Sequence, residues 1–152
     1  MSAIGGATTG TVTVTNAVAI TGNHDQVTAA LVTAGTKVEV EDASVTINDA
    51  DTTAITAAEL SAIGGATTGT VTVTNAVAIS GTTDEVTAAL VTAGTLVDVS
   101  DAAVTISDTP TIAELNAIAA KTTGVVTATL AANSLSNLGD LSTAGTDAIT
   151  IT

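Results

Sequence analysis

The chain of 152 residues carries 15 acidic side chains against two basic ones, Lys37 and Lys121, and its formal net charge is −13. This charge disfavours nucleic acid and anionic membrane surfaces as partners, because both repel an acidic protein. The chain has no cysteine and no aromatic residue, which excludes disulfides, thiolate metal sites and aromatic stacking platforms for sugars or bases. No apolar run approaches the length of a transmembrane helix, so membrane insertion is not expected.

An internal repeat is the dominant feature of the sequence. Residues 2–20 recur letter for letter as residues 61–79, at an offset of 59. A third, diverged copy at residues 116–130 follows the pattern of residues 61–75. Such repeats predict that each unit packs on its neighbours, so the expected partners are neighbouring repeats of the same chain. We divide the single repeat-built domain, residues 1–152, into repeats 2–60, 61–115 and a degenerate 116–152.

Strands are predicted where Val or Ile alternates with polar residues, because this period places one face of a strand in a core. In each coil a first strand follows a glycine, an Asn or Asp then interrupts the alternation, and a second short strand follows. We expect the interrupting residues to stack in one column and to bond corner backbone groups, as Asx turns do. The first strands are 11–15, 38–41, 70–74, 97–100, 125–129 and 148–152; the second are 18–20, 45–47, 77–79 and 104–106; the interrupting residues are Asn16, Asp42, Asn75 and Asp101.

Short helices are predicted after the strands, because their starts carry capping boxes. Thr56, Thr82 and Thr111 are each followed three residues later by Glu, and Asn23 begins a looser version of the same pattern. In such a box the capping side chain accepts the N–H of the third residue, whose own side chain reaches back. The helices are expected to end near glycines, which favour the left-handed conformation of a C-terminal cap. These glycines are Gly35, Gly69 and Gly94.

Together these elements predict an α/β fold: an elongated right-handed solenoid of stacked strand–corner–strand–short-helix coils with parallel β-sheets. Right-handed coiling is expected because parallel strands joined through a helix follow that path. Successive side chains of a strand alternate faces, so the valines point inward and the threonines outward. Stacking then places Thr13, Glu39, Thr72 and Asp98 in one outer column. Acidic and threonine coils alternate there, which keeps like charges about 10 Å apart.

Catalytic chemistry is not indicated, and we do not expect an enzyme. His24 is the sole histidine and the chain lacks cysteine, so nucleophile–base catalysis lacks its usual parts. The loop that corresponds to His24 in the second repeat, residues 81–84, has no histidine. A structural role for His24 is therefore the expectation.

Carboxylates suggest a metal site instead. Asp42, Asp49 and Asp51 are expected near one corner, and Asp101 and Asp108 occupy similar places in the next repeat. Oxygen-rich loops with paired acids suit Ca²⁺, so these five residues are candidate calcium ligands. The glycine-rich calcium nonapeptide and the EF-hand loop are both absent. Because Asp also favours turns and caps, a purely structural role stays open, and no other cofactor is predicted.

Threonines on the strands indicate a further alternative. Regular Thr-x-Thr motifs present a methyl and a hydroxyl at fixed spacing, a pattern found in some ice-binding solenoids, because the threonine χ1 is stiff. Glu39, Glu41 and Asp98 interrupt a uniform threonine surface in this chain, and Thr is also a favourable residue on exposed strands.

The segments 56–74, 77–95 and 111–130 resemble the Ala/Thr/Val-rich tandem repeats of very large bacterial surface proteins, especially those of marine cyanobacteria. The resemblance covers nearly the whole chain. It implies an extracellular or cell-surface location and a role in a stalk or surface layer, with adhesion or motility as its context. It supplies no catalytic residue.

We therefore expect a structural repeat segment that forms a rigid, extended stalk or surface-layer part of a large secreted or cell-surface protein. A calcium-dependent adhesin module and an ice-binding threonine array remain the alternatives. Met1 leads into the middle of a repeat, and residues 148–152 form a strand without a following helix. Because solenoid ends without polar caps expose apolar core and strand edges, end-to-end self-association is expected.

Overall fold

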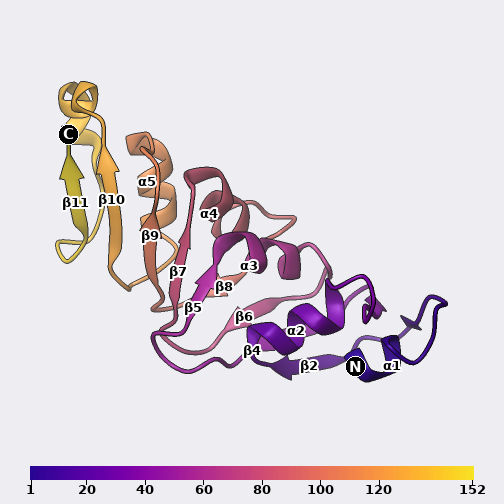
Figure 1. Cartoon of the computed structure of the whole chain (residues 1–152). Coiled ribbons are helices and arrows are strands. Elements are labelled where there is room, and N and C mark those ends of the chain that lie inside the picture. Colours follow the sequence, from indigo (N-terminus) through magenta and orange to yellow (C-terminus); the bar gives the residue numbers. More distant parts are fainter.

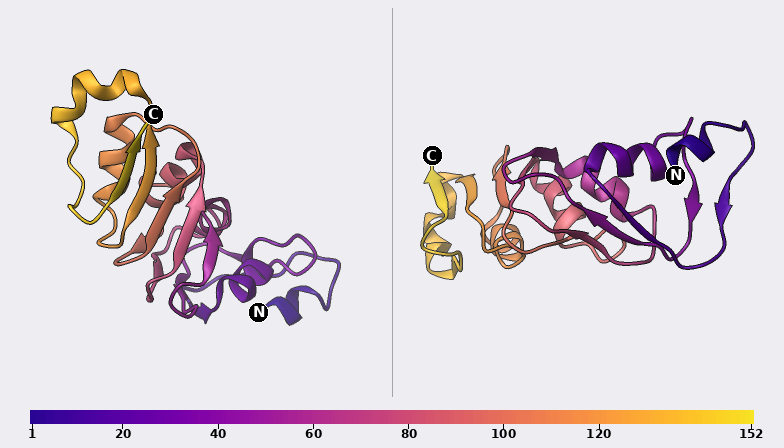
Figure 2. Two further views of the ribbon diagram at one scale, coloured as in Figure 1. Left: turned by 60° about the vertical axis from the view of Figure 1, so that its left-hand side comes forward. Right: turned by 90° about the horizontal axis from the view of Figure 1, so that it is seen from below.

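The computed structural model describes the backbone of residues 1–152 and all side chains except those of residues 133–135. The molecule is elongated, with its N-terminus at one end and its C-terminus near the other (Figure 1 and Figure 2). Its helices are α1 (Ser2–Gly5), α2 (His24–Leu31), α3 (Ala57–Gly64), α4 (Thr83–Leu90), α5 (Ile112–Ala119) and the 3-10 helix η1 (Ala132–Asp140). Its strands are β1 (Thr13–Val14), β2 (Ala19–Gly22), β3 (Glu39–Val40), β4 (Ser44–Ile47), β5 (Ala54–Thr56), β6 (Val71–Val73), β7 (Ala78–Gly81), β8 (Asp98–Val99), β9 (Ala103–Ile106), β10 (Val126–Leu130) and β11 (Ala148–Ile151).

The fold is mixed α/β with parallel sheets and several helices, as the sequence predicts. A four-stranded sheet has the order β2-β4-β6-β8, a five-stranded sheet the order β11-β10-β9-β7-β5, and β1 pairs with β3 alone. The strand pairs of the described chain are parallel. Helices α2 to α5 follow one another along the molecule, each in contact with the next (Figure 1).

The two larger sheets have the same internal order, one repeat apart. In the four-stranded sheet β2 pairs with β4, which pairs with β6 through Val45 and Val71. In the five-stranded sheet β7 pairs with β9, which pairs with β10 through Val104 and Val126. Since β7, β9 and β10 are the repeat counterparts of β2, β4 and β6, equivalent strands pair in the same order in both sheets, although each repeat divides its strands between sheets.

This arrangement contradicts the single outer column that sequence stacking predicts. Thr13 pairs with Glu39, and Thr72 pairs with Asp98, but the two pairs lie in different sheets. The other neighbour of Thr72 is Thr46 of β4, not Glu39 of β3. The physical reason is the spacing of paired strands along the chain. Thr46 precedes Thr72 by 26 residues, as Thr13 precedes Glu39, whereas Glu39 precedes Thr72 by 33. The structure also contains β5, a strand that the alternation does not predict, which pairs with β7.

The predicted column of interrupting Asn and Asp residues is wrong for the same reason. The side-chain amide of Asn75 donates to the backbone carbonyl of Asp49. Asp42 instead lies beside Gly69, where a Cβ atom would be 2.8 Å from the Asp42 carbonyl oxygen. The neighbour of Asn75 is therefore Asp49, not Asp42, and the two interrupting residues do not stack on each other.

The helix starts agree with the sequence and the helix ends do not. Helices α2, α3, α4 and α5 each begin with a complete capping box. No glycine in the described chain has a positive φ, so the predicted left-handed glycine caps are wrong. The Thr36 hydroxyl donates to the carbonyl of Ala29, and the Val38 N–H donates to Ala30. The segment after the helix thus satisfies carbonyls that a glycine cap would otherwise satisfy.

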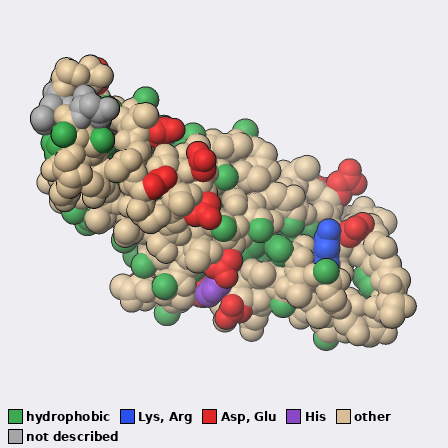
Figure 3. Space-filling view, turned by 45° about the horizontal axis from the view of Figure 1, so that its top comes forward, with side chains coloured by type: hydrophobic (Ala, Val, Ile, Leu, Met, Phe, Trp, Pro, Cys, Tyr) green, Lys and Arg blue, Asp and Glu red, His purple; other side chains and the backbone are tan. Residues whose placement is uncertain are grey.

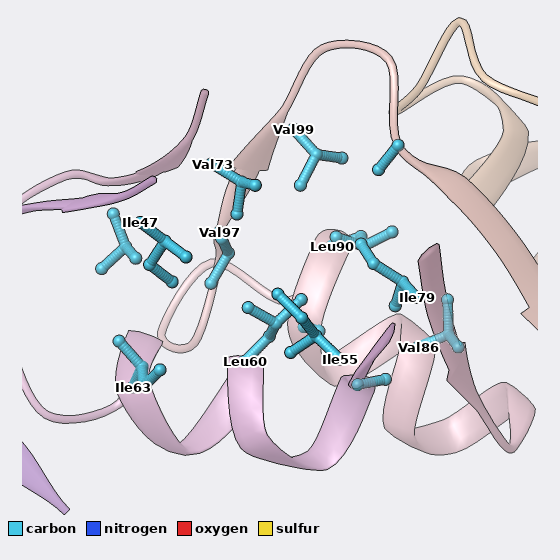
Figure 4. Close-up of a cluster of buried hydrophobic side chains, with 14 of the residues drawn as sticks. Ile47, Ile55, Leu60, Ile63, Val73, Ile79, Val86, Leu90, Val97 and Val99 are labelled. Carbon is cyan, nitrogen blue, oxygen red and sulfur yellow. The ribbon is translucent and has the colours of Figure 1, made fainter. Parts of the chain in front are cut away.

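The core is built from aliphatic side chains that the sheets and helices present to one another (Figure 4). Ile47 and Val73 from the four-stranded sheet face Leu60 of α3, while Ile55 and Ile79 from the five-stranded sheet close the cluster. All five are at most 2% exposed. Burial of such side chains contributes about 1.5–3 kcal/mol each, so this shared core holds the sheets and helices together.

Candidate functional site

Two of the predicted calcium ligands, Asp49 and Asp108, occupy equivalent places in successive repeats. Asp108 follows β9 and accepts hydrogen bonds from the backbone N–H of Thr83 at 2.8 Å and from its hydroxyl at 2.6 Å. Thr83 is the first residue of α4, so Asp108 caps this helix from the next segment of the chain. The Thr83 hydroxyl is the chief cause that holds the pKa of Asp108 below its usual value, although desolvation opposes it.

Asp49 makes the corresponding contacts with His24, the first residue of α2. Its carboxylate accepts the His24 backbone N–H at 2.7 Å, and the ring Nδ1 lies 2.7 Å from its other oxygen. Asp49 is only 6% exposed, and Asp25 lies 3.5 Å from the opposite ring nitrogen. His24 therefore replaces the threonine of the second repeat as a partner of the aspartate.

These helices receive two caps each, which sequence inspection does not reveal. In α4 the Thr82 side chain accepts the N–H of Glu85, and Glu85 accepts the N–H of Thr82 at 2.8 Å. Asp108 then satisfies one further N–H at the same helix end. A helix N-terminus leaves four N–H groups without helical partners and carries partial positive charge, so carboxylates are favoured there. An equal spacing of 25 residues, from 24 to 49 and from 83 to 108, is the sequence signal that could have found the pairs.

Helices α3 and α5 carry the capping box. Glu59 accepts hydrogen bonds from the Thr56 hydroxyl at 2.7 Å and from its N–H at 3.0 Å, and the hydroxyl is the chief cause that lowers the pKa of Glu59. Glu114 accepts the equivalent bonds from Thr111, whose backbone N–H contributes most to lowering the pKa of Glu114. These carboxylates therefore stabilise helix starts in their ionised form.

The loop after β4 is tied to the corner between β6 and β7. Asp51 accepts the N–H of Ala76 at 3.2 Å, and Asn75 donates to the carbonyl of Asp49. Thr52 adopts a positive φ of 64° in this loop. The side-chain and backbone oxygens of the loop are thus used to hold the next repeat in place.

Asp42 and Asp101 are not near the other predicted ligands. Both are exposed and precede β4 and β9, whereas Asp49 and Asp108 follow these strands. A four-residue strand spans about 13 Å, so the prediction that Asp42, Asp49 and Asp51 share one corner is wrong. Asp49 and Asp51 do share a loop. Within the described residues, no group of three or more His, Asp or Glu side chains is arranged to hold a metal ion.

The strand threonines form short rows. In the five-stranded sheet Thr105 pairs with Thr127, and Thr129 pairs with Thr150. Acidic side chains are spread along the face that Figure 3 shows. The threonines lie in separate rows because strands that follow one another along the chain, such as β6 and β7, belong to different sheets.

A hollow of about 400 Å³ lies at the N-terminal end of the molecule. Its lining includes Ala19 and Ile20 of β2 and Val27 and Ala30 of α2. On this side β2 is the first strand of its sheet and has no strand beyond it in the described chain. We refer to β1, β2 and this hollow as the open N-terminal edge.

The chain matches no family model, no curated protein and no solved structure with which it was compared. In the described part of the chain, no helix combines the length and the apolar character that crossing a membrane requires.

Proposed function

We propose that the chain is a structural segment whose repeats stack as an elongated right-handed solenoid. In this proposal the segment forms a rigid stalk or surface-layer part of a large secreted or cell-surface protein. The observation that carries the proposal is the shared design of the two larger sheets, in which β2-β4-β6 and β7-β9-β10 pair in the same order. A design that repeats with the sequence is one that further repeats would extend.

The contacts between successive repeats support a mechanical role. Asp108 and Asp49 each hold the start of a helix that lies about one coil earlier in the chain. Thr68 and Thr123 likewise donate hydroxyl hydrogen bonds to the carbonyls of Glu41 and Ser100. Each coil is therefore bonded to its neighbour by side chains as well as by strand pairing, which resists bending and separation of the coils.

The composition is consistent with this role. Aliphatic side chains without any aromatic ring fill the core, and a net charge of −13 favours the solubility of an extended acidic surface. The extracellular or cell-surface location rests on the resemblance to tandem repeats of large bacterial surface proteins. Calcium binding and ice binding are kept as alternatives, and neither is required by the contacts described above.

Small-angle X-ray scattering on a length series tests the proposal. Proteins that carry one, two or three further copies of residues 2–60 should lengthen by equal steps of about 10 Å, two parallel strand spacings, for each repeat. The cross-sectional radius of gyration should stay constant through the series. A maximum dimension that grows with the cube root of the mass would show a compact globule and refute the proposal.

A further inference from the structure

Identical residues have different surroundings in the first and second repeats. Ile4 is 61% exposed, whereas its counterpart Ile63, in the same sequence context, is 0% exposed. Val12 is half-buried, and its counterpart Val71 is buried. Since the sequences are identical over these residues, the difference arises from what packs against each copy.

In the second repeat the covering segment is residues 44–60. Its first part, β4, pairs with β6 through Val45 and Val71. Its second part, β5, pairs with β7 so that Ile55 lies beside Ile79. Its last part is the first half of α3, where Leu60 is fully buried. Figure 4 shows Ile55, Ile79 and Leu60 in one cluster.

The first repeat lacks this cover in the described chain. The hollow of the open N-terminal edge is lined by Ala19, Ile20, Val27 and Ala30, together with Met1, Ser2, Thr21 and Gln26. Ile20 is 8% exposed and Ala30 4%, whereas their second-repeat counterparts Ile79 and Ala89 are at most 1% exposed. The hollow therefore lies where β5 and the start of α3 pack one repeat later.

We propose that the open N-terminal edge is a binding site for a strand–loop–strand–helix segment with the sequence pattern of residues 44–60. By the register of the second repeat, Val45 of this segment pairs with Val12, and Ile55 pairs with Ile20. The segment adds parallel strands to β1 and β2, so backbone hydrogen bonds provide affinity and the buried side chains provide register. This inference rests on the proposed stacking of repeats.

A second folded copy of the chain is not the occupant that the geometry favours. Within a folded copy β4 already pairs with β2 and β6, and β5 already pairs with β7. The C-terminal edge also differs from the open N-terminal edge. The five-stranded sheet ends in β11, the counterpart of β8, which is itself an outermost strand of its sheet. Within the described chain, β2 therefore lacks a neighbour that its counterpart β7 has in β5.

Register-specific cross-linking of a synthetic peptide tests the proposal. The peptide carries residues 44–60 with Thr56→Cys, and the protein is the full chain with Thr21→Cys. Thr21 is the counterpart of Ser80, which pairs with Thr56, and both Thr21 and Ser80 are exposed. Parallel neighbours lie about 4.8 Å apart, within the Cα separation that a disulfide spans. Because the natural chain has no cysteine, each variant has a single reactive thiol.

The matched control is Ser80→Cys, whose strand edge is already occupied by β5. In a glutathione redox buffer we expect the Thr21→Cys protein to cross-link at least ~10-fold faster than the Ser80→Cys protein, because binding raises the effective thiol concentration. A peptide that also carries Ile55→Asp should lose this advantage. The unmodified peptide should raise the melting temperature of the natural chain, a readout that needs no variant.

Equal cross-linking rates for the two proteins, together with no change in melting temperature, would overturn the proposal. A dimer that forms without peptide, and that peptide does not disperse, would assign the edge to a second copy and overturn it too. Either result can be distinguished from failure of the proposed function, which the scattering experiment tests. The maximum dimension can still grow linearly with the number of repeats when the peptide does not bind.

Discussion

Gly64, the last residue of α3, lies directly against the backbone carbonyl of Thr95, and a Cβ atom at Gly64 would be 2.1 Å from the Thr95 oxygen. Gly5 has the same relationship to the carbonyl of Thr36 in the first repeat. The contact joins the end of one helix to the segment that follows the next helix. Glycine is required here for close approach and not for a left-handed backbone conformation, because no described glycine has a positive φ.

Gly64→Ala should therefore destabilise the protein by more than about 2 kcal/mol, since a backbone carbonyl cannot move aside as a flexible side chain can. Gly65→Ala is the matched control. Its nearest neighbours would be 3.4 Å away, and its φ of −72° suits alanine. Chemical denaturation of both variants measures the difference. Equal stability of the two variants would show that the packing of α3 against Thr95 is looser than described.

Replacing the aspartates that cap α2 and α4 should lower the free energy of unfolding by different amounts. For Asp49→Ala we expect a decrease of about 2–3 kcal/mol, because it removes the partner of a half-buried histidine and of a helix N–H. For Asp108→Ala we expect a smaller decrease, about 1–2 kcal/mol, since Asp108 is exposed. Urea unfolding of the two variants measures both values. If each variant lost less than about 0.5 kcal/mol of unfolding free energy, the two carboxylates would not contribute to holding neighbouring repeats together.

His24→Thr provides a further test of the same contact. It converts the first-repeat pair into the pair seen between Thr83 and Asp108. We expect a change in unfolding free energy within about 0.5 kcal/mol, whereas His24→Ala should be clearly less stable. If the threonine variant is as unstable as the alanine variant, the two sites are not structurally equivalent.

The ionised caps predict acid sensitivity. Hydrogen bonds lower the pKa of Glu59, Asp108 and Glu114 in the folded state. For an acid with a lowered folded pKa, the stabilisation is present above the unfolded pKa and is lost as the pH falls through the folded pKa. The melting temperature should therefore fall from about pH 5 towards pH 3.

Thr83→Val removes the hydroxyl that contributes most to the lowered pKa of Asp108. Its melting temperature should fall less steeply with decreasing pH than that of the natural chain. Calorimetric scans at half-unit pH steps would measure the two slopes, and identical slopes would exclude Asp108 as a source of the acid sensitivity.

Calcium should have a weak effect or none. If Asp42, Asp49, Asp51, Asp101 and Asp108 were ligands, added Ca²⁺ would raise the melting temperature by mass action and a chelator would lower it. The oxygens of Asp49, Asp51 and Asp108 already accept hydrogen bonds from the protein. Isothermal titration calorimetry measures binding directly. A submicromolar site would contradict this expectation and favour the adhesin alternative.

Much of the local structure could be predicted from the sequence. The capping boxes at Thr56, Thr82, Thr111 and Asn23 mark helix starts that the structure contains. Capping depends on residues three apart, so a local pattern is sufficient. The valines of residues 71–73 are buried as the alternation indicates, because a strand buries every second side chain.

The pairing between repeats could not be predicted in the same way. It depends on the interval between paired strands, because Thr46 precedes its partner Thr72 by 26 residues and alternation alone does not reveal this interval. The roles of Asp49 and Asp108 depend in turn on which segments this interval brings together. Strand β5 could not be predicted either, since three residues of alternation are too few to recognise beside the helix start at Thr56. In the second repeat the position of Ile55 is taken by Pro110, which has no N–H for a strand ladder, and the described chain has no counterpart of β5 there.

Strand β4 of the first repeat, and not β3, lies beside β6 of the second. Nuclear magnetic resonance can detect this pairing through scalar couplings across hydrogen bonds in uniformly labelled protein. We expect a coupling between the Val45 amide nitrogen and the Thr70 carbonyl carbon, since this N–H donates to that oxygen at 2.8 Å. We also expect nuclear Overhauser effects between Thr46 and Thr72. Nuclear Overhauser effects between Glu39 and Thr72, without that coupling, would show that β3 is the neighbour of β6 and that the first strands stack in a single column.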